Sequence, residues 1–469
     1  MPSSLDRIKN VIEIVNEVSP TFCLAKWHHV TIYMHTGETH SCYHPPPHAI
    51  PIRELEDNPS ALHNTLHKKK ERALMLVGEK PTGCQYCWNV ENLSDTHISD
   101  RLIRNGALYT PERMEEIKNN LWSHNINPEY IEISFSNECN FKCGYCHPKH
   151  STSYYNEIKQ YGPYKDTSEH GNAIDKFIIH KEEDSPYIQA WWKWWPEMSN
   201  SLTILRVTGG EPLLHRTTWK LFDKLIKDPK PHLELNFNSN MGVTPRIVEK
   251  FANNVKLLLD NDAVKDFKLY TSMDTWGKRA EYIRTGLKVD LWEKNIDTFI
   301  NTTHKEVSIM CTFNILSVTS FIDFLEKVLY WRKKYHHILN LKHKKQTPRR
   351  IRFDTPYLKE PLQFDMNILP KEEYLPYFDK ILQFISDHKD ESDPTMFNEL
   401  EYEKFRRVRD YFATTNYKPE RVERGRADFY SWFSQYDQRR DQNFLETFPD
   451  MQNFYELCKQ INIQRNSNG

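Results

Sequence analysis

The sequence predicts an α/β protein built on six parallel strands, and two observations carry that prediction. The first is a series of short apolar runs with the length and composition of buried strands, at 131–135, 202–207, 233–237, 268–273, 307–313 and 351–353. The second is the helical spacing of the stretches between them, as in the recurrence of Phe222, Leu225 and Ile226 after Pro212. Strands that alternate with helices form βα units, and these pack into a parallel sheet that is open or closed into a barrel.

The two ends of the 469-residue chain differ from its middle in composition. Residues 1–125 carry a Pro- and His-rich stretch and four cysteines, residues 126–367 carry the βα pattern, and residues 368–469 have the charged and aromatic pattern of surface helices. The sequence therefore predicts an N-terminal segment, an α/β core and a helical C-terminal extension. In such cores, functional groups gather at the C-terminal ends of the strands.

Charge and hydrophobicity narrow the class of protein. Lys and Arg total 63 and Asp and Glu total 64, so the balance requires neither nucleic acid nor an anionic membrane as a partner. The N-terminus lacks a basic stretch leading into an apolar run, and no window of 18 uninterrupted apolar residues occurs. We expect a cytoplasmic protein with no membrane association.

Three cysteines follow the first predicted core strand with C-x3-C-x2-C spacing: Cys139, Cys143 and Cys146. Closely spaced cysteines in an intracellular protein bind metal more often than they form disulfides. Three thiolates on a four-iron cube leave one iron free for a further ligand. The alternative is a zinc knuckle completed by His147 or His150.

This triplet, with an aromatic residue before its last cysteine, resembles the signature of the radical S-adenosylmethionine (SAM) superfamily. A second match is RVTGGEPLL after the second strand, which is similar to the family's GGEP motif for the methionine amino group of SAM. The resemblance implies a partial (β/α)6 barrel and a [4Fe–4S] cluster that holds SAM. One electron, from a donor such as flavodoxin or ferredoxin, then cleaves SAM to methionine and a 5′-deoxyadenosyl radical that abstracts hydrogen from a substrate. The cofactor-binding residues it implies in these two motifs are Tyr145, Gly209, Gly210, Glu211 and Pro212.

Polar residues at two further strand ends also match the family, though less specifically. Those after the third and fourth strands are Asn238, Ser239, Asn240, Ser272 and Asp274. In the family these positions face the ribose and carboxylate of SAM, and Arg284 is a candidate partner of the methionine carboxylate. The alternative is that they are ordinary loop polar residues and a surface arginine.

Four N-terminal cysteines, Cys23, Cys42, Cys84 and Cys87, can complete a second metal site with no open position, holding zinc or a second [4Fe–4S] cluster. The segments around them look like the auxiliary iron–sulfur segment of twitch-domain-containing radical SAM proteins, which implies an auxiliary [4Fe–4S] cluster suited to electron transfer. Family members usually have Pro in place of Lys26 and a second cysteine beside Cys42. The resemblance reaches the C-terminus, where FSQYDQRRDQNFLETFPDM is similar to a recurrent D-x-x-R … FPE segment.

The sequence thus predicts a radical SAM oxidoreductase or modifying enzyme that acts, in an oxidative reaction, on a peptide, a sugar or another small molecule. The alternative is a non-catalytic zinc-binding module that recognises nucleic acid through its N-terminal cysteines and the basic run 332–350. That alternative leaves the open cysteine triplet and GGEP unexplained.

Overall fold

The computed structural model describes residues 11–92, 98–120, 122–165, 167, 174, 185–339 and 349–467. The basic run 332–350 lies partly outside these residues, because 340–348 are not among them. Within the described ranges, no helix combines the length and apolar character that a membrane crossing requires.

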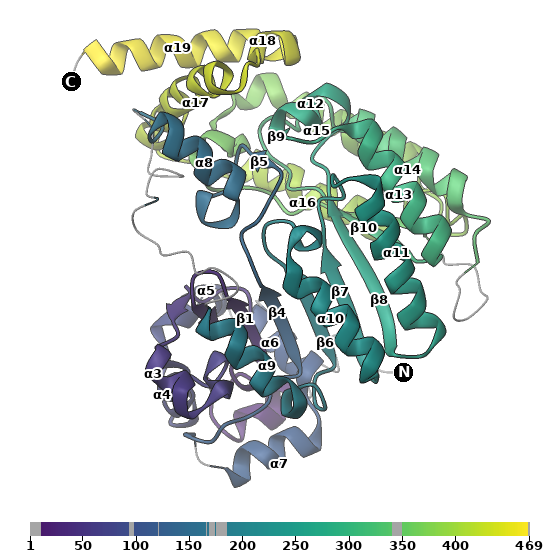
Figure 1. Ribbon diagram of the computed structural model, residues 1–469. Coiled ribbons are helices and arrows are strands. Elements are labelled where there is room, and N and C mark those ends of the chain that lie inside the picture. The colour runs from purple at the N-terminus through teal and green to yellow at the C-terminus, as the bar shows by residue number, and fades with distance from the viewer. Residues whose placement is uncertain are drawn as a thin grey trace.

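All six predicted strands are present and lie side by side in chain order. They are β4 (Tyr130–Ser134), β6 (Ile204–Thr208), β7 (Lys230–Asn238), β8 (Val264–Ser272), β10 (Val307–Met310) and β11 (Ile351–Asp354). Every neighbouring pair among them is parallel, and β11 is an edge strand, so the sheet is open. The predicted α/β fold with a (β/α)6 unit is confirmed (Figure 1).

Helices connect these strands, because a parallel pair needs a long crossover between its members. They are α8 (Thr152–Tyr161), α9 (Pro186–Met198), α10 (Arg216–Lys227), α11 (Pro245–Asp260), α12 (Gly277–Ile283), α13 (Val289–Thr303) and α14 (Phe321–Tyr335). A cluster of aromatic rings joins helix to sheet: Phe251 of α11 lies 5.5 Å from Phe237 of β7 and 5.8 Å from Phe267 of β8, between ring centroids. Burial of these rings is the main source of stability at this interface.

The other face of the sheet is polar. On β8, Phe267 and Leu269 are buried, whereas Tyr270 between Leu269 and Thr271 is half-buried. Since successive strand side chains point to opposite faces, Tyr270 lies on the face away from the helices. Side chains from four strands line a cavity there: Arg206, Tyr270, Ser308 and Arg352.

The sheet continues into the N-terminal segment, which the sequence did not predict. β1 (His29–Tyr33) pairs in parallel with β4, and β2 (Glu38–His40) and β3 (His48–Ala49) extend the sheet in antiparallel pairs. The helices of this segment are α2 (Ala25–His28), α3 (Ile52–Asp57), α4 (Leu66–Leu76), α5 (Gln85–Glu91), α6 (Asp100–Leu108) and α7 (Pro111–Asn119). The boundary near residue 125 stays a prediction, and the sheet crosses it.

The C-terminal extension is helical, as predicted. Its helices are α15 (Lys371–Asp387), α16 (Glu399–Thr414), α17 (Pro419–Arg440), α18 (Phe444–Thr447) and α19 (Gln452–Ser467). Helix α17 lies beside α8 and the short strand β5 (Lys142–Cys143), both of which follow β4 (Figure 1). The extension therefore contacts the loop that carries the cysteine triplet.

Candidate functional site

The cysteine triplet lies in the loop after β4, and all three of its thiols are half-buried. Three N–H groups point at its sulfur atoms. The Phe141 backbone and the Asn240 side-chain amide donate to Cys139 Sγ at 3.4 and 3.9 Å, and the Arg284 guanidinium donates to Cys143 Sγ at 3.8 Å. Such donors stabilise thiolate ligands and tune iron–sulfur clusters, so the donor set fits the predicted cluster.

Burial raises the pKa of all three thiols, that of Cys146 to about 12, and the charge of Cys143 adds to the rise at Cys139 and Cys146. These thiols therefore keep their protons near neutral pH unless a metal centre replaces the protons. In the described part of the chain, no three His, Cys, Asp or Glu side chains meet closely enough to coordinate a single ion. The ligands of a four-iron cluster each bind a different iron.

The two glycines of GGEP allow this loop to touch the cysteine loop directly. A Cβ on Gly210 would stand 2.2 Å from the Glu138 carbonyl oxygen, and one on Gly209 would stand 2.6 Å from Ser134 Oγ. Gly209 also has a φ of +122°, which other residues rarely adopt. Only glycine fits at these two positions, which bring the loop after β6 against the cysteine loop.

The Glu211 carboxylate ties the loops after β6 and β7 together. It is 1% exposed and accepts hydrogen bonds from the Leu213 N–H at 3.1 Å, the Ser239 hydroxyl at 2.8 Å and the Asn240 N–H at 2.6 Å. Burial raises its pKa to about 7, although these hydrogen bonds oppose the rise. Pro212 begins the short helix η5 (Pro212–Leu214) that Glu211 caps. The family resemblance implies that this carboxylate binds the methionine ammonium; in the structure it already accepts from three donors of the chain.

Tyr145, Asp274 and Arg284, which lie far apart in the sequence, meet beside Cys143. The Asp274 carboxylate is fully buried and accepts two hydrogen bonds from Arg284 at 2.9 Å, one from the Tyr145 hydroxyl at 2.8 Å and one from the Thr312 N–H at 3.0 Å. Asp274 thus holds Arg284, which is a buried residue and not a surface arginine. The role of Asp274 toward the ribose stays a prediction.

Two other predicted residues end their strands at the same edge of the sheet. Asn238 is half-buried at the end of β7, and its side-chain amide oxygen accepts a hydrogen bond from Arg206 Nε at 2.9 Å. Ser272 is half-buried at the end of β8, beside Met310 of β10. Their roles toward SAM stay predictions.

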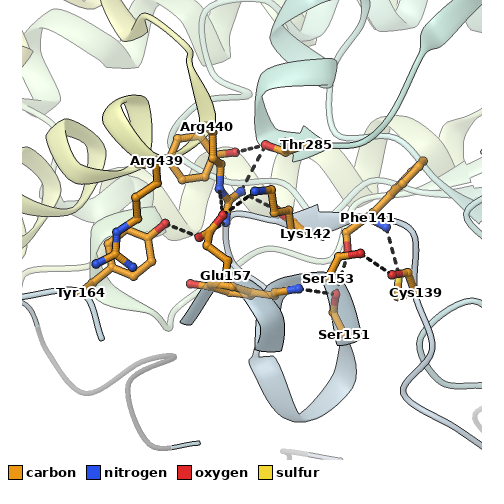
Figure 2. A network of polar contacts seen from close by, with 12 residues as sticks. Cys139, Phe141, Lys142, Ser151, Ser153, Glu157, Tyr164, Thr285, Arg439 and Arg440 are labelled. Carbon is orange, nitrogen blue, oxygen red and sulfur yellow. Dashed lines mark hydrogen bonds and ion pairs between the residues drawn. The ribbon is translucent and has the colours of Figure 1, made fainter. Parts of the chain in front are cut away.

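Helix α17 anchors the cysteine loop through one buried ion pair, which sequence reasoning missed (Figure 2). Arg440 is bidentate to Glu157 of α8 at 2.9 and 3.0 Å, and it also donates to the carbonyl oxygen of Lys142, between Cys139 and Cys143. Burial alone would raise the pKa of Glu157, but Arg440, Lys142 and Tyr164 outweigh it and lower the pKa. The sequence marks one partner of this ion pair, because Arg440 is the arginine of the D-x-x-R segment that is similar to the family's.

The four N-terminal cysteines, which come from widely separated segments, line one cavity: Cys23, Cys42, Cys84 and Cys87. Cys42 has a φ of +48°, a strained conformation that is common at functional sites. Burial raises the pKa of Cys23 to about 12 and that of Cys87 to about 11, and all nine cysteines of the chain are free of disulfides. The four predicted ligands thus line a common cavity, and the metal site itself stays a prediction.

A buried lysine completes this cavity. Lys26, which replaces the proline usual in the resembled family, is 2% exposed and donates to Glu71 at 2.7 Å. Burial opposes its charge, but Cys84 and Glu71 raise its pKa above the usual range. The lysine is therefore a fixed positive charge beside the four sulfur atoms.

Comparison with known proteins gives partial matches. No protein-family model matches the chain. It is 26% identical to a GTP 3',8-cyclase of Sulfurovum sp. over 175 residues, 36% of this chain and 46% of that protein. It is 28% identical to a GTP 3',8-cyclase of Campylobacter jejuni over 173 residues, 37% of this chain and 43% of that protein. The chain spans about half the length of the curated relatives it matches.

Two solved structures are similar over 55% of this chain and 60% of theirs: native anSMEcpe with bound AdoMet, at a TM-score of 0.33 and 17% identity, and the same protein with AdoMet and the Kp18Cys peptide, at 0.34 and 14%. The twitch-like nature of the N-terminal segment stays a prediction. GTP 3',8-cyclases are radical SAM enzymes, and these relatives confirm the resemblance seen in the sequence: the chain is a relative of the radical SAM superfamily.

Proposed function

We propose that the protein is an enzyme that binds SAM at a [4Fe–4S] cluster held by Cys139, Cys143 and Cys146. The observation that carries the proposal is the contact between the three-thiol loop and the GGEP loop, which only glycine at positions 209 and 210 permits. When bound, the cluster supplies the electron that cleaves SAM to methionine and a 5′-deoxyadenosyl radical, which takes a hydrogen atom from the substrate. A flavodoxin or ferredoxin is the proposed electron source.

The chain's own residues have distinct tasks in this proposal. Arg284, held by Asp274 and Tyr145, presents its remaining N–H groups beside Cys143 and offers a cation to the methionine carboxylate. Glu211 holds the GGEP loop against Ser239 and Asn240, and its negative charge favours an ammonium group nearby. Asn238 and Ser272 supply short polar side chains for the ribose.

The reduced, anaerobically purified enzyme should convert SAM to 5′-deoxyadenosine, even slowly and without substrate. Liquid chromatography with mass spectrometry measures the product. Protein that carries a reducible cluster and binds SAM, yet releases no 5′-deoxyadenosine, would rule the proposal out.

Glu211→Gln should weaken SAM binding roughly ten- to a hundredfold, because hydrogen bonds to a charged group contribute about 1.5–3 kcal/mol. The amide also places an NH2 group opposite either the Asn240 N–H or the Leu213 and Ser239 donors, which bind different oxygens of Glu211, and this loosens the contact between the loops. Equilibrium dialysis of SAM against the anaerobic protein tests this. Glu249→Gln, an exposed position on α11, is the matched control and should leave the affinity unchanged. Equal affinity in both variants would remove Glu211 from the SAM site.

We also propose an auxiliary [4Fe–4S] cluster at Cys23, Cys42, Cys84 and Cys87, which accepts an electron from the substrate in an oxidative reaction. The support is that four thiols satisfy all four irons and leave no vacancy for SAM. The alternative occupant is zinc.

The purified protein should then carry about eight iron and about eight sulfide ions per chain. A Cys84→Ala, Cys87→Ala variant should lose about half of the iron and still form 5′-deoxyadenosine. Metal analysis by mass spectrometry decides between the occupants. Stoichiometric zinc with about four iron would refute the auxiliary cluster and leave the core site intact.

A further inference from the structure

A cavity of about 590 Å³ opens on the polar face of the sheet. Its volume falls within the range of small-molecule sites, roughly 300–1,000 Å³. Its walls come from the N-terminal segment, from the strands and from the start of α16. Five basic side chains line it: Arg104, Arg206, Arg349, Arg352 and Lys404.

The two carboxylates in the lining are already neutralised. Glu401 is bound by the buried Arg332 at 2.5 Å, and Asp354 pairs with Lys404 at 3.1 Å. Four arginines remain, so the cavity carries an excess of positive charge. An excess of this kind attracts and holds an anion.

Two of these four arginines have carboxylate partners outside the cavity lining. Arg352 pairs with Glu306 at 2.9 Å, and Arg206 lies 3.8 Å from Glu132. Both pairs leave guanidinium N–H groups for another acceptor, because a guanidinium has five donors.

The other two, Arg104 and Arg349, have no carboxylate within ion-pair distance among the described residues. Arg104 lies over the ring of Tyr43, 4.6 Å from its centroid. Within the part of the chain that the structure describes, Arg349 donates only to backbone carbonyl oxygens, of Met396 at 3.3 Å and of Asp390 at 3.4 Å. A planar guanidinium without an anion is suited to bidentate binding of phosphate or carboxylate.

The cavity adjoins the cavity of the four N-terminal cysteines, because Arg104 lines both. Tyr43, which also lines it, follows Cys42 in the chain. On the sheet, Met310 and Asp354 of the lining are the last residues of β10 and β11, and the loop of the core triplet follows the same, C-terminal end of the parallel strand β4.

We propose that this cavity binds the substrate, and that the substrate is an anionic small molecule carrying phosphate or carboxylate groups. This assignment rests on the proposed function, and it adds the chemical class of the substrate on which the proposed radical SAM enzyme acts. Arg104 and Arg349 bind the anionic groups. Arg206, also in the lining, donates a hydrogen bond to Asn238 at the end of β7, a residue proposed to face the ribose of SAM.

Calorimetric titration of the anaerobic holoenzyme with tripolyphosphate and with citrate tests the proposal. We expect one-to-one binding that weakens with added salt, and Arg104→Gln and Arg349→Gln should each weaken it roughly tenfold or more. Arg246→Gln, an exposed arginine of α11 outside the cavity, should bind like the wild type. Tighter binding of tripolyphosphate identifies a phosphorylated substrate, and tighter binding of citrate a carboxylated one.

Iron content and thermal unfolding establish that each variant is folded. Absence of binding by the wild type, or equal binding by all variants, would overturn the proposal. A neutral peptide that binds in place of the anions, and is weakened by the same two substitutions, would assign the cavity to a peptide and overturn it as well. No step of this test requires SAM cleavage, so its failure is distinguishable from failure of the proposed radical chemistry.

Discussion

Replacing Cys139, Cys143 and Cys146 together by alanine should abolish formation of 5′-deoxyadenosine and remove about half of the iron. The loss is complete because the site that leaves an iron open for SAM no longer exists, while the four N-terminal cysteines offer no vacancy. Iron analysis and chromatography of reaction mixtures measure both effects.

Cys458→Ala is the matched control, since this buried thiol of α19 lies in neither cysteine cluster. It should keep the full iron content and full SAM cleavage. Residual cleavage by the triple variant would mean that another site reduces SAM, and it would remove the triplet from its assigned role.

Arg440→Met should destabilise the protein by about 3 kcal/mol, because it leaves the Glu157 carboxylate buried without its main partner. Removing one member of a buried ion pair typically costs about 3–5 kcal/mol. We place the effect at the lower end, since Lys142 still pairs with Glu157 at 2.7 Å. The midpoint of urea unfolding, compared at equal cluster content, measures the change.

Arg424→Met, an exposed position on the same helix, should change stability by no more than about 0.5 kcal/mol. Arg440→Met combined with Glu157→Leu should recover much of the loss, because apolar residues then replace both buried charges. An Arg440→Met protein as stable as the wild type would show that the C-terminal helix does not hold the cysteine loop.

The strands, and the strand ends at which the triplet and GGEP lie, were predictable because their signals are local. Each core strand is a short apolar run, and the triplet and GGEP lie within a few residues of a strand end, where parallel sheets gather functional loops. The recurrence of Phe222, Leu225 and Ile226 likewise reports the buried face of one helix.

The partners in contacts between distant segments were not predictable from one sequence. The D-x-x-R match marks Arg440, but nothing near Glu157, 283 positions earlier, indicates that Arg440 neutralises it. The pairing of β1 with β4 and the meeting of Arg104 with Arg349 in one cavity also depend on tertiary folding. The family resemblance implies that Asp274 faces SAM, but the sequence did not reveal that its hydrogen-bond partners in the chain come from three other segments.

Electron paramagnetic resonance of the reduced Cys84→Ala, Cys87→Ala variant, with and without SAM, tests the central claim most directly. This variant retains only the cluster assigned to Cys139, Cys143 and Cys146, so its spectrum reports that site alone. We predict that SAM shifts the g-values of the signal, because SAM coordinates the iron that the three thiolates leave open. An unchanged spectrum at saturating SAM would contradict the account.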